Sequence, residues 1–193
     1  MAQRTHQRPE PVLRGVATPA TPEGMAVLIA AGAQGARLAP AAVARALARG
    51  LERGGLAPPE VLELAHGRSS SELDKALQRE RFDARLHAAR ALLIATEQLS
   101  ERSLPHSAAF ELATRARQAG VPAYAVVARS ALDAFDARLL DLQLILRARG
   151  ATALARAAED LAAVLLAADE PTPHRPRRAR AQPPGAGSRS ART

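Results

Sequence analysis

The chain has 193 residues, 47% of them hydrophobic and only 2% aromatic, and it contains no cysteine. This length suits a single domain with extra segments at its ends, and the missing cysteines exclude disulfides, thiolate chemistry and zinc sites of the cysteine type. The net charge is +8 and Lys75 is the only lysine among 27 basic residues, a bias that a GC-rich coding sequence explains better than selection for nucleic-acid binding.

The two ends of the chain differ in composition from its middle. Residues 1–24 are rich in proline, threonine and arginine, and residues 169–193 hold six arginines among proline, glycine and serine. Neither segment has an apolar period, and both compositions are typical of disorder. We therefore predict one folded domain, residues 25–168, between a disordered N-terminal arm and a disordered Arg/Pro-rich tail.

The folded part begins with a short apolar run, "MAVLIA" at residues 25–30, which predicts a buried strand. Gly32 and Gly35 break this strand, and Pro40 suits the first turn of a helix. That helix, "PAAVARALARGLER", carries apolar residues four apart on one face and arginines on the other. The glycine pair at residues 54–55 ends it.

The middle of the domain combines helical segments with a second strand. Ser71 and Asp74 resemble a capping box, which opens a helix to about residue 80. "FDARLHAAR" at residues 82–90 is a further helical piece, and "ALLIA" at residues 91–95 is a buried strand followed by a polar loop. A helix is then expected over residues 105–118.

The last third repeats this alternation. Gly120 is expected to end the preceding helix as a C-cap residue, and strands follow at residues 121–128, "VPAYAVVA", and 142–146, "LQLIL". The closing helix is predicted at residues 152–168. Strands that are apolar on both faces and alternate with helices predict an α/β fold, a parallel sheet with helices on both faces.

Part of the sequence resembles a known family. "FDARLHAARALLIATEQLSERSLPHSAAFELATRARQAGVPAYAVVA", residues 82–128, is similar to the C-terminal part of bacterial glycerate kinases, and "VLIA…RLAPAAVARALARGL" is similar to their opening strand and first helix. The resemblance covers about residues 26–168. It implies the discontinuous α/β domain of these kinases, with ATP and Mg²⁺ as cofactor and metal and phosphorylation of glycerate as the family activity.

Two departures from the family pattern predict a catalytically degraded protein. The family's middle domain, which forms the second wall of the substrate cleft, is missing. In addition, Gly32, Gly35, Ser100 and Ser107 stand where the resemblance places Asp, Lys, Asp and Lys. Phosphoryl transfer depends on such charges around the phosphates and Mg²⁺. The alternatives are an active glycerate kinase with relocated catalytic groups and a nucleic-acid or interaction protein that uses its Arg-rich tail.

Some polar residues around the expected loops remain as candidates. Glu97 and Glu101 can hold Mg²⁺ and Arg102 can contact a phosphate, or all three are solvated surface residues. Gly32 and Gly35, with Arg37, and His106 are the corresponding candidates for anion or phosphate binding. The histidines show no metal-binding spacing, so no resident metal site is predicted.

The sequence also suggests partners and a compartment. Loss of the middle domain exposes a face that can mediate self-association, and the tail can give weak, non-specific nucleic-acid binding. No window approaches the roughly 18 apolar residues of a membrane helix, and "MAQRTHQRPE" lacks the apolar core of a signal peptide. We therefore expect no membrane association and a cytoplasmic protein.

Overall fold

A computed structural model describes residues 25–65, 69–100, 107–132 and 140–169 and contains one parallel sheet. Its five strands are β1 (Val27–Ala31), β2 (Glu60–Glu63), β3 (Ala91–Ser100), β4 (Ala123–Ala131) and β5 (Leu142–Arg147). They lie in the order β2-β1-β3-β4-β5, and every adjacent pair is parallel. The predicted α/β fold is confirmed, and the strand order is that of flavodoxin-like doubly wound sheets.

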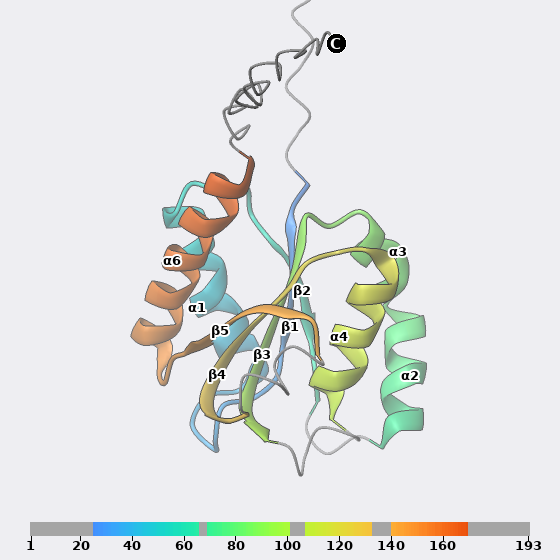
Figure 1. The fold of residues 1–193 in the computed structure, drawn as a ribbon. Coiled ribbons are helices and arrows are strands. Elements are labelled where there is room, and N and C mark those ends of the chain that lie inside the picture. Colours follow the sequence, from blue (N-terminus) through green and yellow to red (C-terminus); the bar gives the residue numbers. More distant parts are fainter. Residues whose placement is uncertain (1–24, 66–68, 101–106, 133–139, 170–193) are drawn as a thin grey trace, which may run out of the picture.

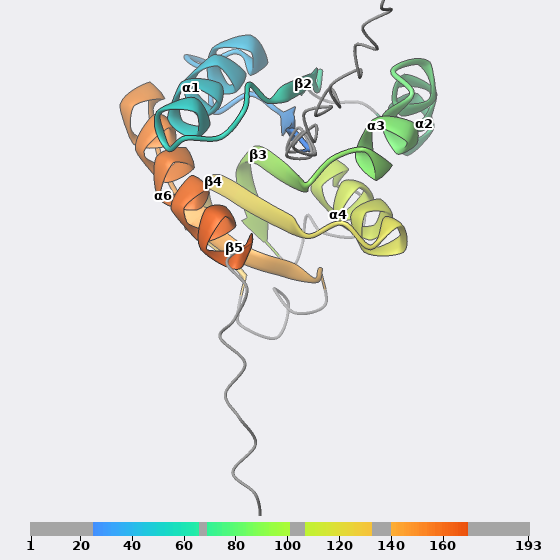
Figure 2. The same cartoon turned by 90° about the horizontal axis from the view of Figure 1, so that it is seen from above.

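Helices cover the sheet on both faces (Figures 1 and 2). One face carries α1 (Pro40–Arg53) and α6 (Ala151–Asp169), and the other carries α2 (Ser70–Arg79), α3 (Phe82–His87) and α4 (Ala108–Ala119). Successive side chains of a strand point to opposite faces of the sheet and pack into the two helical layers in turn. In β1, for example, Val27 and Ile29 pack with α1 and α6, whereas Leu28 packs with the other helices.

The strand β2 was missed by the sequence analysis. It is a four-residue edge strand, and Leu62 is its one buried residue, so its sequence lacks a clear apolar run. β2 is a strand because it pairs with β1, and its amino-acid composition alone does not predict one. Arg85 of α3 lies against this strand: its Nε donates to Glu60 Oε2 at 2.7 Å and its Nη2 donates to the Val61 carbonyl at 2.9 Å.

The prediction of a polar loop directly after residue 95 is wrong. β3 continues to Ser100, and β4 pairs with it as far as the Ser100–Ala131 partners. Hydrogen bonds to β4 pair the backbone of this segment. Its side chains are mostly partly exposed, so they can be polar although the segment is a strand. The three other predicted strands agree with the structure within a few residues at their ends.

The starts of α2 and α4 differ from the predicted ones. Ser69, rather than Ser71, caps α2: its Oγ accepts from Glu72 N at 3.3 Å, and Glu72 Oε2 accepts from Ser69 N at 2.9 Å. Glutamate reaches back to the cap better than the shorter Asp74, which moves the capping box two residues upstream. Ser107 caps α4, whereas Pro105 lies outside the described residues.

Two other expected helix ends are confirmed. Pro40 is the first residue of α1, where its missing N–H is harmless. Gly120 ends α4 in the left-handed conformation, with φ at +69°.

The helices α1 and α6 touch through their smallest residues. A Cβ added to Gly50 would overlap the Ala155 carbonyl oxygen and lie 2.7 Å from Ala158 Cβ, and one added to Gly54 would overlap Ala162 Cβ. The two helices therefore meet backbone to backbone at these glycines. Close approach lets short alanine side chains fill the core without voids.

We expect Gly50→Ala to destabilise the protein, although alanine favours helices. Overpacking costs about 1–3 kcal/mol, whereas alanine regains at most about 1 kcal/mol of helix propensity. Chemical denaturation should show a lower midpoint for this variant. Arg49→Ala, at the exposed neighbouring position, is the control and should leave the midpoint nearly unchanged; equal effects of the two substitutions would contradict the close contact.

Tyr124 lies on β4 and is only 8% exposed. Burial raises the pKa of its phenol, and the positive charge of Arg90 offsets part of that rise. It is the single tyrosine of a chain without tryptophan, so absorbance of tyrosinate reports this one side chain.

The ionisation of Tyr124 should therefore depend on folding. We expect its absorbance titration to have a midpoint above the usual value near 10 in the native protein and near that value in urea. Because the folded-state pKa is the higher one, this group's contribution to stability is fully present below pH about 10 and is lost as the pH rises through the folded-state pKa. Identical midpoints with and without urea would refute the effect of burial.

Candidate functional site

The sheet changes direction of winding between β1 and β3. β1 leads into α1 on one face, whereas β3 is followed in sequence by α4 on the other face. In open sheets of this kind, ligands bind at the carboxyl ends of the two strands where the connections diverge. The end of β1, where Ala31 pairs with Ala95, is therefore the first place to look for a site.

The turn after β1 lies against this position. Gly32 N donates to the Ala95 carbonyl at 2.8 Å, and Gln34 N donates to the Leu38 carbonyl at 2.9 Å. The Gly32 amide, a candidate anion donor from the sequence, is thus already bonded to β3. Gly35 has φ at +64° and sits next to Glu97, and Arg37 is exposed in the same turn.

The start of α1 adds few donors for an anion. Pro40 has no N–H, and the amides of Ala42 and Val43 both donate to the Ala39 carbonyl, at 2.9 and 3.1 Å. Ala39, the N-cap residue, makes no side-chain cap hydrogen bond. The glycine-rich turn therefore precedes a helix start with little of the free N–H array that binds phosphates elsewhere.

Gln34 is the buried polar residue of this turn, and the sequence analysis did not identify it. Its side chain is only 5% exposed, and its Nε2 donates to the Thr96 carbonyl at 3.3 Å. Its Oε1 is buried and has no hydrogen-bond partner among the described residues. Its place between Gly32 and Gly35, directly after a strand, marks it only as a turn residue, and its burial follows from the contact with Thr96.

Glu97 comes from β3 rather than from a loop. Its side chain is 23% exposed, and its Oε1 accepts from Nη2 of Arg129, on β4, at 3.0 Å. A Mg²⁺ ion bound by Glu97 would compete with this arginine. Glu101, Arg102 and His106, the other polar candidates, lie outside the described residues, and within the described ranges no three His, Cys, Asp or Glu side chains gather closely enough to hold a metal ion.

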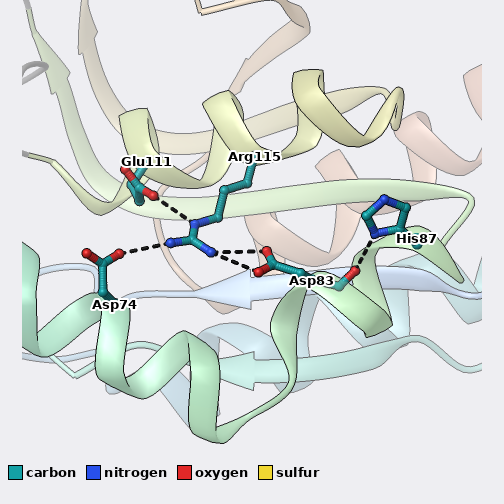
Figure 3. A network of polar contacts seen from close by, with 5 residues as sticks. All are labelled: Asp74, Asp83, His87, Glu111 and Arg115. Atoms are coloured by element: carbon teal, nitrogen blue, oxygen red, sulfur yellow. Dashed lines mark hydrogen bonds and ion pairs between the residues drawn. The ribbon is translucent and has the colours of Figure 1, made fainter.

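A second polar cluster lies in the opposite layer and is built around Arg115 of α4 (Figure 3). Its guanidinium contacts Glu111 at 2.7 Å, Asp74 of α2 at 2.9 Å and both carboxylate oxygens of Asp83, of α3, at 3.0 and 3.1 Å. Burial lowers the pKa of Arg115, but hydrogen bonds to Glu111 and Asp83 outweigh it, so the pKa is raised overall. This cluster joins three helices.

Glu111 and Arg115 are four residues apart on α4, the spacing at which opposite charges on a helix pair. Asp83 also contributes its carbonyl, which lies 2.7 Å from Nδ1 of the exposed His87. Every carboxylate of the cluster is paired with the same guanidinium. We therefore interpret the cluster as a structural contact between helices.

Comparison with known proteins assigns the chain to no family. No family model matches it, and no curated protein is similar to it. Among solved structures, the Burkholderia pseudomallei protein called "Putative pilus assembly-related protein" aligns with 23% identity and a TM-score of 0.44 over 74% of this chain and 92% of that one. In the described residues, no helix is both long and apolar enough to cross a membrane.

The unpaired Oε1 of Gln34 leads to a stability prediction. A buried acceptor without a donor costs about 1–3 kcal/mol, so Gln34→Met, which keeps the volume and removes the amide, should be neutral or stabilising in urea denaturation. Gln34→Ala, which leaves a cavity, should be destabilising by about 2 kcal/mol or more. Equal losses in both variants would mean that Oε1 has a partner, such as a buried water.

Proposed function

We propose that this chain is a non-catalytic interaction domain on a doubly wound frame, without phosphotransferase activity. The observation that carries the proposal is Gln34, whose buried side chain reaches from the turn after β1 to Thr96 of β3. A ligand in a fold of this kind would lie at this end of the two strands. The turn after β1 instead bonds to β3 at this position, through Gly32 N to the Ala95 carbonyl and Gln34 Nε2 to the Thr96 carbonyl.

The chemistry of phosphoryl transfer supports the same proposal. It requires cationic groups on the phosphates, carboxylates on Mg²⁺ and free backbone amides. Here the Gly32 amide is bonded to Ala95, and the Glu97 carboxylate is paired with Arg129. Ser100, where the resemblance places an aspartate, is the last residue of β3 and is paired with Ala131 of β4.

The resemblance to glycerate kinases, which rests on the order of motifs, stays a prediction. Nucleic-acid binding through the tail also stays a prediction, and the tail lies outside the described residues.

An interaction role is supported by apolar side chains that α6 exposes. Val164 and Leu166 of this helix are 46% and 40% exposed.

A coupled assay of ADP release tests the lack of activity. With ATP, Mg²⁺ and glycerate, we expect the purified full chain to show no glycerate-dependent turnover above background, because uncharged Gly32, Gly35, Ser100 and Ser107 stand where the resemblance places charged residues. Glu97→Ala and Arg129→Ala should not change that result. Turnover that Glu97→Ala abolishes would establish a relocated catalytic carboxylate and refute the proposal.

A further inference from the structure

A polar groove lies between α1 and α6, the two helices that run side by side on one face of the sheet (Figures 1 and 2). It has a volume of about 570 Å³. Its charged and polar lining residues are Arg49 and Arg53 of α1 and Thr152, Arg156, Glu159 and Asp160 of α6. All six are exposed, so the groove opens to solvent. We call it the α1–α6 groove.

The acidic residues of the α1–α6 groove leave two of its arginines without a partner. Arg53 Nη2 pairs with Glu159 Oε2 at 3.1 Å. The side chains of Arg49 and Arg156 make no hydrogen bond or ion pair with any described residue, and the same holds for Asp160. Two unpaired guanidinium groups therefore line one groove, one from each helix.

Arginines also recur along α1 at a spacing that does not favour the helix. Arg45, Arg49 and Arg53 are four residues apart, which places them on one side of α1 at intervals of about 6 Å along its axis. Like charges at this spacing destabilise a helix. Within the described part of the chain, neither Arg45 nor Arg49 has a carboxylate partner that offsets the repulsion. An anionic partner that lies along this row would relieve it.

The chemistry of arginine defines what the groove can recognise. A planar guanidinium donates two parallel N–H bonds to one carboxylate or phosphate, and it stays charged at physiological pH. An open groove between two helices suits a further helix rather than an enclosed small molecule. A helix with an acidic residue at every fourth position repeats its carboxylates at the same interval as the arginines of α1.

Two features favour an acidic protein segment over a nucleic acid. Asp160, which has no cationic partner among the described residues, would repel a strand that carries a phosphate on every unit, whereas a protein segment can place a neutral or basic residue there. Single strands also stack their bases on exposed aromatic side chains. In the described residues, the one exposed aromatic side chain is Phe110, on α4 in the other layer.

We propose that the α1–α6 groove binds a helical segment of a partner protein that carries acidic residues four apart, and that Arg49 and Arg156 each hold one of its carboxylates. The inference rests on the proposed function, since it gives the interaction domain a class of partner. Because the contacts are charge-assisted hydrogen bonds at an exposed surface, binding weakens as the salt concentration rises.

Fluorescence anisotropy of a labelled peptide tests the groove. The probe is an alanine-based helical peptide with glutamate at every fourth position, titrated with the full chain at low salt. We expect saturable binding that Arg49→Glu and Arg156→Glu each weaken about ten-fold or more, because each variant loses a charge-assisted hydrogen bond and gains a repulsion. Arg117→Glu is the matched control: Arg117 is exposed on α4, and its substitution changes the net charge equally. It should change the affinity less than about two-fold, since distant exposed charges are screened.

A second peptide, with lysine in place of each glutamate, separates recognition of charge from a change of fold. The double variant Arg49→Glu/Arg156→Glu should bind it more tightly than the wild type does. Circular dichroism melts check the fold, and Arg49→Ala and Arg156→Ala replace any charge-reversed variant that unfolds.

The proposal is overturned if the glutamate peptide does not bind, or if Arg117→Glu weakens binding as much as the groove variants. It is overturned as well if a labelled single-stranded oligonucleotide binds more tightly than the peptide through the same two arginines, because the partner is then a nucleic acid. A chain that neither binds the peptide nor turns over glycerate refutes only the groove. Glycerate turnover refutes the non-catalytic function, whatever the peptide does.

Discussion

The close approach of α1 to α6 is the constraint on which one half of the molecule depends. The chain has three phenylalanines, one tyrosine and no tryptophan, so few large side chains are available to fill space between a helix and a sheet. Gly50 and Gly54 remove the side chains that would hold the two helices apart. Alanines such as Ala158 and Ala162 then become fully buried, and dispersion contacts between many small groups replace those of a few large ones.

The two helical layers are held together by different means. On the α1 and α6 side, close packing at the two glycines dominates, with one exposed ion pair between Arg53 and Glu159. On the other side, Arg115 joins α2, α3 and α4 through three carboxylates. The Arg115 side chain is 20% exposed, so each ion pair adds only modestly to stability. Its larger effect is on geometry, because one planar guanidinium fixes the relative positions of helices from three separate segments.

The fold was largely predictable because the core strands are apolar on both faces. β1 and the first half of β3 carry continuous runs of buried residues, which have few other interpretations. β2 could not be found this way, since Glu60 and Glu63 bracket a single buried leucine and pairing with β1 decides its structure. The polar end of β3 was assigned to a loop for the same reason: its order comes from β4.

The candidate site was harder to predict than the fold. Its buried member, Gln34, is distinguished only by contact with Thr96, 62 residues further along the chain. No local pattern reports a contact of that range. Glu97 was selected for its charge, but its pairing with Arg129 depends on the register of β3 against β4. Residue types thus indicated where polar groups lie, whereas the register of the strands determines which of these groups form hydrogen bonds or ion pairs.

The contact of Arg85 with β2 has a consequence for aggregation. An edge strand presents unpaired carbonyls and amides, which a strand of another chain can use to extend the sheet. At β2, the Val61 carbonyl already accepts from Arg85, and the Glu60 carboxylate holds the same guanidinium in place. An incoming strand would have to displace this ion pair and leave a charge facing it. A short strand with an arginine bonded to its carbonyl is therefore a poor template for pairing with a strand of another folded chain.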